Sequence, residues 1–335
     1  MQHDSMSILG KRACPGLCAA VFLVALSAVG CGGEEVEDPG AELIELARTS
    51  SAITAADLAS HTRALSDDRM MGRGPGTEGE AVTLEYLQAA FEGIGLVPKG
   101  DSALPGAPPG SPPYLQEVEL VGITADSETA RLSFRGPGDA PELVLEQGRD
   151  FVTRTAIPEE IVDISGGVVF AGYGIHAPEE GWTDFGDTDV EGRILLVLPG
   201  EPPIEDPDRF GGEAATYHGR WTAKIEEGAR RGAAGVLLIH DPDTAAYTWE
   251  VIRGRTGERL QKTDLSVLPP RTPLQGWISG EAGERVFAAA GFSLGELAAS
   301  AAREEFSAVD LGSVADGHLE NTVRQVTSYN VVGAV

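Results

Sequence analysis

The sequence predicts an α/β protein of about two domains. Its 335 residues, 42% of them hydrophobic, are enough to bury a sizeable core. Near-continuous apolar runs at 194–198 and 236–239 are typical of neighbouring buried strands, and a helical pattern lies between them. Apolar residues at helical spacing over 82–94 predict a further helix, well ahead of this strand-rich part.

Capping signals place several helices. Thr54 with Asp57 has the spacing of a capping box, and Ser293 with Glu296 repeats it. Gly95 follows an apolar helical stripe, as glycine does after many helices. The expected helices span 54–64, 82–94, 220–231, 280–290 and 294–303. The expected strands span 131–135, 166–171, 193–198 and 235–239.

The net charge of −27 excludes the usual electrostatic route to nucleic acid, because no basic stripe is present to displace counterions from phosphates. It also argues against binding to an anionic membrane surface. We interpret the acidity as a solvated surface that keeps the protein soluble, and we assign it no role in catalysis.

The first 30 residues have the pattern of a signal peptide. Lys11 and Arg12 precede an apolar run over 13–30 that ends in small residues. The alternative is a membrane-spanning anchor, but the fully apolar core, 19–26, is too short to span a bilayer comfortably. The run 32–40 is nearly devoid of apolar residues, and we expect 31–50 to be a flexible tether.

Cys31 ends the segment Leu26–Cys31, which resembles a bacterial lipobox, although Ala28 stands where leucine is commoner. The resemblance implies that Cys31 becomes the lipidated first residue. Cys14 and Cys18 lie in the segment that would be removed, so the mature chain would contain no intramolecular disulfide. We therefore expect an exported lipoprotein, anchored by lipid to a membrane and facing the periplasm or the cell surface.

Two stretches carry a resemblance to a known family. The run 67–79 contains a Gly-Arg-x-x-Gly-Thr sequence at 72–77 and precedes the helix expected at 82–94. With 95–98 and 114–116, it is similar to the start of metallopeptidases related to aminopeptidase Y and glutamate carboxypeptidase. In that family this turn opens the first long helix.

The second stretch comprises 168–175, 189–194, 220–224 and 232–241. It resembles the protease-associated domain that is inserted into bacterial members of the family. The run 328–333, Ser-Tyr-Asn-Val-Val-Gly, looks like the strand with which the peptidase domain resumes. The expected organisation is a signal peptide at 1–30, a tether at 31–50, the helical start of a zinc exopeptidase domain at 51–131, an α+β protease-associated domain at 132–318, and the return to the peptidase domain at 319–335.

The resemblance implies a peptidase with two zinc ions, held by histidine and carboxylate ligands, and a glutamate as general base. Two metals polarise the scissile carbonyl and lower the pKa of water. The family's first ligand pair, His-x-Asp, follows the Asn-Val-Val-Gly strand, but this sequence contains no His-x-Asp and ends at Val335. No residue of this chain therefore matches a catalytic position of the family, and the catalytic half is missing.

We expect the N-terminal portion of an exported zinc-dependent aminopeptidase, inactive and without bound zinc by itself, whose full-length form acts on peptides. The alternative is a surface-anchored binding module that uses the protease-associated domain without catalysis. A carboxypeptidase specificity within the same family also stays open, since most of the specificity pocket belongs to the missing half.

Three residues are candidates for a substrate cleft: Arg220, Trp221 and His240. For Trp221 we favour a core position, because Ile225 lies four residues further along the same helix face. Arg220 stays undecided. His240 and Asp241 follow a strand, but adjacent residues of an extended chain point to opposite faces, which favours an ordinary turn over a metal-ligand pair.

His318 and Glu320 have the spacing of two ligands on one face of a strand. Gly317 and Asn321 nevertheless favour a surface turn. His61, His176 and His218 have no paired ligand and are expected to be surface or hydrogen-bonded residues; the glycine patterns at 74–79 and 172–177 lack the strand-then-helix context of a dinucleotide site.

Overall fold

The computed structural model describes residues 52–103, 110–204, 206, 209–210, 216–245, 247–254, 257–264 and 269–335. Within these ranges the protein combines helices with mixed β-sheets, so the α/β class is confirmed. The expected signal peptide, the tether and Cys31 lie outside the described residues.

A small helical unit begins the described chain and comprises α2 (Ala55–Leu65), η1 (Asp68–Arg73) and α3 (Glu78–Gly93). The predicted capping box of α2 is present: the Asp57 amide donates to the Thr54 hydroxyl and the Thr54 amide donates to the Asp57 carboxylate. The core of this unit is small. Its buried residues are Ala64, Met70, Tyr86 and Ala90.

The irregular end of η1 and the start of α3 explain the glycines of the first motif. Met71 and Arg73 have positive φ angles of 46° and 58°, flanking Gly72 at 78°. Residues other than glycine rarely adopt this left-handed backbone conformation. At Gly79 a Cβ atom would lie 2.3 Å from the carbonyl oxygen of Met70, so only glycine fits there.

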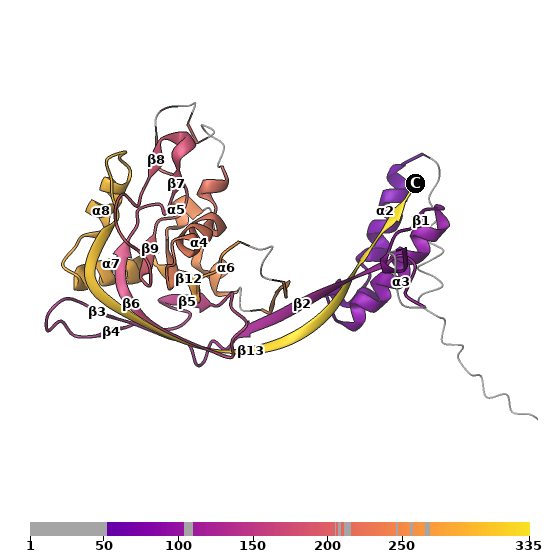
Figure 1. Ribbon diagram of the computed structural model, residues 1–335, viewed down its shortest axis with the longest axis horizontal. Coiled ribbons are helices and arrows are strands. Elements are labelled where there is room, and N and C mark those ends of the chain that lie inside the picture. Colours follow the sequence, from indigo (N-terminus) through magenta and orange to yellow (C-terminus); the bar gives the residue numbers. More distant parts are fainter. Residues whose placement is uncertain are drawn as a thin grey trace, which may run out of the picture.

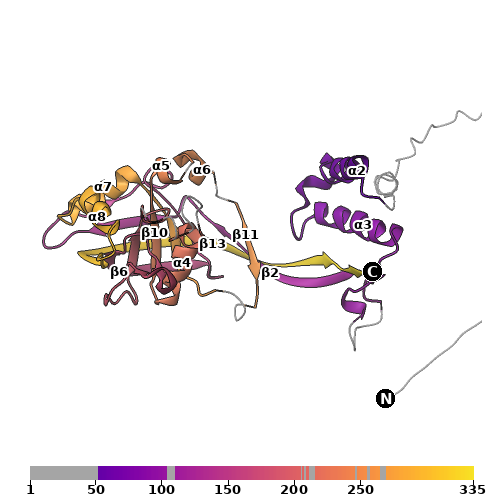
Figure 2. The same ribbon diagram turned by 90° about the horizontal axis from the view of Figure 1, so that it is seen from above.

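Two long strands connect the helical unit to the rest of the protein. β2 (Leu115–Ala125) leaves the helices, and β13 (Val309–Val331) returns to them, paired antiparallel from Leu115↔Val331 to Asn321↔Ala125. Figures 1 and 2 show this ribbon running from the larger unit to the helices. Beyond it, β14 (Gly333–Ala334) pairs with β1 (Val97–Pro98), so the chain that returns through β13 pairs again with a strand that directly follows the helices.

The larger α/β unit is built on one sheet whose strands lie in the order β11-β2-β13-β6-β9-β10-β12-β5, with β3 and β4 added beside β13. The four central strands β6, β9, β10 and β12 are parallel, and the flanking strands are antiparallel. The strands not yet located are β3 (Arg131–Arg135), β4 (Leu143–Val144), β5 (Phe151–Arg154), β6 (Ile161–Phe170), β9 (Ile194–Val197), β10 (Gly235–His240), β11 (Arg259–Lys262) and β12 (Leu274–Ser279).

Helices cover both faces of this sheet. Leu237 and Ile239 of β10 belong to the core shared with α7 (Gly280–Ala289) and α8 (Leu294–Ala301). Val236 and Leu238 belong to the opposite core, shared with α4 (Trp221–Arg230) and α6 (Trp249–Arg253). This alternation is the strand's two-residue period, and it explains why β10 is buried at every position.

The remaining elements are short and lie in the connections. They are η2 (Asp101–Ala103), β7 (His176–Ala177), η3 (Pro178–Glu180), β8 (Trp182–Thr183), η4 (Tyr217–Gly219) and α5 (Pro242–Ala245). β7 and β8 pair with each other in a separate hairpin.

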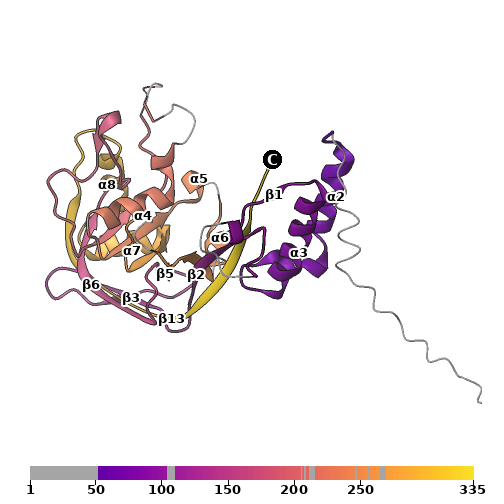
Figure 3. The same ribbon diagram turned by 45° about the vertical axis from the view of Figure 1, so that its right-hand side comes forward.

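The expected helices and the strands at 131–135, 166–171, 193–198 and 235–239 are all present, within a few residues of the expected ends. The expectation of a turn around His318 is wrong. β13 continues through this region (Figure 3), and Gly317 pairs with Ile164 on one side and Leu132 on the other. A Cβ atom at Gly317 would lie 3.0 Å from the Ile164 side chain, so close packing, not a turn, favours the glycine. The expected domain boundary after His318 falls inside this continuous strand.

Candidate ligand-binding site

A pocket lies where the two edges of the sheet approach each other. β5 and β11 stand at opposite ends of the strand order, yet Val152, Arg154 and Arg259 line the same pocket. Side chains connect the two edges: Gln261 Nε2 of β11 donates to the Ala156 carbonyl, just beyond β5, at 2.9 Å. The sheet therefore curls until its edges meet, and this edge pocket is a consequence of the curl.

Arg154 lies against two tryptophans at one wall of the edge pocket. Its guanidinium carbon is 4.8 Å from the ring centroid of Trp221 and 4.9 Å from that of Trp277. The two indoles are 5.3 Å apart, centroid to centroid. Cation–π contacts of this kind are worth about 0.5–2 kcal/mol each. Trp221 starts α4 and Trp277 lies in β12, so helix and sheet together fix the Arg154 side chain.

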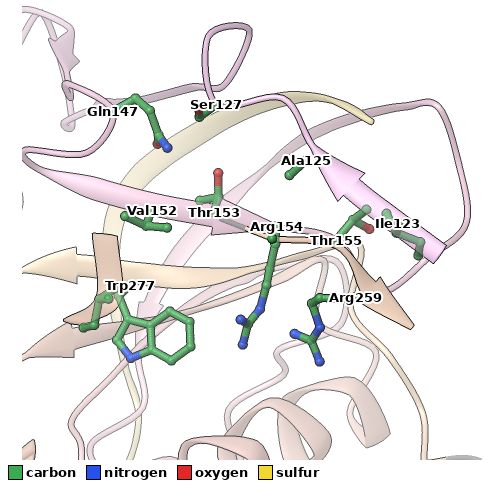
Figure 4. Close-up of a pocket in the computed structure, with 12 residues that line it drawn as sticks. Ile123, Ala125, Ser127, Gln147, Val152, Thr153, Arg154, Thr155, Arg259 and Trp277 are labelled. Atoms are coloured by element: carbon green, nitrogen blue, oxygen red, sulfur yellow. The ribbon is translucent and has the colours of Figure 1, made fainter. Parts of the chain in front are cut away.

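Arg259 is the second cation of the edge pocket. Figure 4 shows its side chain extending to the same side of the strands as that of Arg154. Its Nη1 atom is buried and has no hydrogen-bond partner among the described residues. Burial lowers the pKa of Arg259, and the positive charge of Arg271 lowers this pKa further. The guanidinium is thus partly desolvated beside a like charge.

Arg271 completes the group from the loop before β12. Its Nη1 atom donates to the Ala156 carbonyl at 3.1 Å, and burial lowers its pKa. Arg259 and Arg271 also line a neighbouring hollow together with Trp221 and Glu226. Three arginines and two tryptophans therefore gather at the meeting edges of the sheet.

The carboxylates beside these arginines are already engaged. Glu226 accepts a hydrogen bond from the Tyr217 hydroxyl at 2.6 Å and lies 3.9 Å from Arg230. Glu258, next to Arg259 in sequence, is held by two bonds from Arg324. Among the described residues, no ion pair of Arg259 or Arg271 offsets this positive charge.

The structure brings Arg220 and Trp221 together but leaves His240 apart. Exposed Arg220 is the N-cap of α4 and shares with Trp221 a hollow beside Gly200 and Tyr247. Trp221 is half-buried: it packs on Trp277, as the core interpretation expected, and also lines the hollows on either side.

His240 is a packed core residue at the end of β10. It is 6% exposed, its Nε2–H donates to the Tyr247 carbonyl at 2.9 Å, and its ring lies between those of Tyr247 and Trp249. Asp241 instead accepts hydrogen bonds from the amide of Asp243 and the hydroxyl of Thr244. The two neighbours therefore point to different partners, as expected for adjacent residues.

The remaining histidines have ordinary partners. His318 Nδ1 lies 2.7 Å from Asp163, its cross-strand neighbour, and its Nε2 lies 3.8 Å from Glu320. His61 bonds to the Tyr86 hydroxyl at 2.6 Å, and His218 bonds to Glu179 at 2.9 Å. The hydrogen bonds of His61 and His218 agree with the interpretation from sequence, and exposed His176 lies 3.3 Å from the Thr183 hydroxyl.

Sequence reasoning missed two buried charged residues, Lys224 and Asp184, beneath the second glycine pattern. Lys224 of α4 is 1% exposed, and its ammonium donates to the carbonyls of Tyr173, Gly200 and His218 at 2.6, 2.8 and 3.3 Å. Asp184 is fully buried and accepts hydrogen bonds from the Ile175 amide and the Trp182 indole.

Burial dominates the titration of both groups. It lowers the pKa of Lys224 to about 7 and raises the pKa of Asp184 to about 7, while their mutual attraction partly offsets each shift. Gly174 fits close against Val197 and the Lys224 side chain, which explains the glycine at 174 without a cofactor. Lys224 thus links α4 by hydrogen bonds to the loop at 172–174 and to the backbone at Gly200 and His218.

Zinc ligands are not assembled in the part of the chain that the structure describes. No group of three or more His, Cys, Asp or Glu side chains there is arranged to hold a metal ion. The described residues thus do not fit the two-zinc site that the resemblance implies. In the same ranges, no helix has both the length and the apolar character needed to cross a membrane.

Comparisons with models of protein families and with curated proteins returned no match for this chain.

Proposed function

We propose that this chain is the N-terminal portion of an exported, zinc-dependent aminopeptidase that carries an inserted protease-associated domain. The observation that carries the proposal is the path of the chain. It starts in the helical unit, leaves through β2, forms the whole α/β unit, and returns through β13 to pair β14 with β1. This is the path that an insertion into another domain requires.

The motifs support the same assignment from the sequence side. The Gly-Arg-x-x-Gly-Thr turn at 72–77 precedes α3, the first long helix of the described chain, as in the family it resembles. The strand β13 carries the Tyr-Asn-Val-Val run back beside α3, where the Ser328 hydroxyl donates to the Glu80 carboxylate. In this proposal the helices and the last part of β13, from residue 319, belong to the peptidase domain, and the α/β unit shapes access to its site.

Among the described residues, no three His, Cys, Asp or Glu side chains gather to hold a metal ion, so no catalytic step is assigned to them. Their contribution is structural: the β2–β13 ribbon holds the α/β unit beside the helical unit. Zinc content and aminoacyl-nitroanilide hydrolysis by the native protein test the proposal.

A second candidate function is a surface-anchored binding module without catalysis. The observation that favours it is the edge pocket, since Arg259 presents a buried guanidinium nitrogen without a hydrogen-bond partner among the described residues. Binding at this pocket would need no metal. The two candidates differ in whether zinc and peptidase activity accompany the native protein.

The proposed lipidation of Cys31 leads to a separate prediction. The Cys31→Ser variant should move from the detergent-extracted membrane fraction to the soluble fraction, because the chain would lose its site of lipidation. Fractionation followed by immunoblotting measures this. Cys18→Ser is the matched control and should stay with the membrane, since Cys18 lies in the segment expected to be removed. A mature N-terminus that mass spectrometry finds unacylated, at any residue other than Cys31, would overturn the lipoprotein assignment.

A further inference from the structure

We propose that the edge pocket is a carboxylate-binding site, with Arg259 as its principal anchor and Arg154 and Arg271 beside it. Its ligand is a small organic acid or the C-terminal carboxylate of a short peptide. The inference concerns the α/β unit alone and does not depend on the assignment as a zinc peptidase.

The first argument is the state of the Arg259 guanidinium. Its Nη1 atom is buried without a hydrogen-bond partner in the described part of the protein. Buried polar atoms of proteins almost always have a partner, and an unpaired buried charge is costly. An anion in the pocket would supply the missing acceptor.

The second argument is the concentration of positive charge in a strongly acidic protein. The chain has a net charge of −27, yet Arg154, Arg259 and Arg271 gather at one place. The charge of Arg271 already disfavours the charged form of Arg259. A bound anion would relieve this repulsion, whereas the acidic remainder of the surface would repel the same anion.

The third argument is the shape and chemistry of the pocket. A guanidinium presents a planar fork of donors that matches a planar carboxylate. Ile123, Val152 and Trp277 supply apolar walls beside it. The pocket has a cavity volume of about 30 Å³, and the adjoining hollow, which shares Arg259, has about 180 Å³. The smaller space suits the carboxylate group, and the larger one accommodates the rest of a short ligand.

Tryptophan fluorescence provides the test, because Trp221 and Trp277 lie against Arg154. The whole chain is titrated with acetate, succinate, N-acetyl-dialanine, its C-terminal amide, and inorganic phosphate. We expect saturable binding of at least one carboxylate and none of the amide. N-acetyl-dialanine binding more tightly than acetate and succinate would identify a peptide carboxylate, and the reverse order would identify a small organic acid.

Variants separate binding from folding. Arg259→Met should weaken carboxylate binding by about tenfold or more, since it removes a charge-assisted bond. Its melting temperature without ligand should stay the same or rise, because the substitution removes a partly desolvated cation that lies beside the like charge of Arg271. Arg271→Gln is the second variant and should weaken binding without removing the Arg259 anchor. Exposed Arg253, in α6, provides the matched control Arg253→Met, which should bind as the wild type does.

Three results would overturn the proposal. One is the absence of saturable binding for every carboxylate at concentrations up to tens of millimolar, on the order of the weakest specific affinities. The second is unchanged carboxylate affinity in both Arg259→Met and Arg271→Gln. The third is binding of phosphate alone.

Discussion

Replacing Lys224 by methionine should lower the free energy of unfolding by about 3 kcal/mol or more, because each buried acceptor left without its donor costs about 1–3 kcal/mol. The substitution leaves the carbonyls of Tyr173, Gly200 and His218 without the ammonium that bonds all three, and leaves Asp184 buried without a nearby cation. Urea unfolding followed by circular dichroism measures the change. The matched control is Lys262→Met in β11, where the side chain is exposed, and it should change stability by less than about 0.5 kcal/mol. A loss at Lys224 no larger than that of the control would show that the buried bonds do not stabilise the fold.

The same residue sets a pH dependence whose sign is fixed by linkage. Burial lowers the pKa of Lys224 from 10.5 to about 7, so between these values the unfolded chain binds more protons than the folded one. The contribution of Lys224 to stability therefore rises from pH 7 to 10.5 and is lost as the pH falls through about 7. Between pH 7 and 10.5, the free energy of unfolding should increase more for the wild type than for Lys224→Met. Parallel curves would contradict the buried position of the ammonium.

The contribution of Asp184 to stability changes with pH in the opposite direction. Burial raises its pKa from 3.8 to about 7, so its contribution is present below pH 3.8 and is lost as the pH rises towards 7. The wild type should therefore receive its smallest combined contribution from the pair near pH 7.

The second large effect is a difference in local stability between the helical unit and the α/β unit. The helical unit buries four core residues, whereas the two cores of the α/β unit bury 24 and 14. Local stability follows the apolar contacts that opening must break, so opening of α2 and α3 should cost at least about 3 kcal/mol less than opening of β9 and β10. Hydrogen–deuterium exchange with mass spectrometry measures both.

Limited proteolysis supplies an independent control for this difference. The first cuts in the described chain should fall within the helical unit or its connections, and the central strands of the α/β unit should stay intact longest. Equal protection of α3 and β10, with a single cooperative transition, would contradict two units of unequal stability and favour one continuous fold.

The helices and the central strands could be predicted because their signals are local. Capping residues such as Thr54 and Ser293 mark helix starts through contacts with residues three positions further along the chain. Both hydroxyls accept a hydrogen bond from the expected backbone amide. The near-continuous apolar runs form β9 and β10, which are buried on both faces. Runs of this kind are typical of strands in the centre of a sheet that is covered on both sides.

The long strand β13 could not be predicted in full because its sequence contains turn-forming residues. Buried and more exposed positions alternate regularly from Asp310 to Thr322, but Ser313, Gly317 and Asn321 occupy buried positions where apolar side chains would have marked the strand in the sequence. Gly317 fits between two neighbouring strands, and the Asn321 side chain donates to the Glu159 carbonyl. Both roles depend on partners more than 100 residues away in the chain.

The two groups of buried charges also escaped the sequence analysis, for different reasons. Lys224 lies on the apolar face of α4, three residues after Trp221, and a lysine in such a stripe was a usable signal for a buried cation with partners. The arginine group had no such signal. Arg154, Arg259 and Arg271 come from three separate segments that meet only because the sheet curls.

The measurement that tests the central proposal most directly is made on the native protein. Antibodies raised against the α/β unit recover it from membranes, and zinc is measured by mass spectrometry beside hydrolysis of leucyl-p-nitroanilide. For the full-length form that the aminopeptidase proposal requires, we predict about two zinc ions per molecule, as in two-metal hydrolases, and an activity that chelation abolishes and added zinc restores. A native protein that holds no zinc and hydrolyses no aminoacyl substrate would contradict the aminopeptidase proposal and leave the binding module as its function.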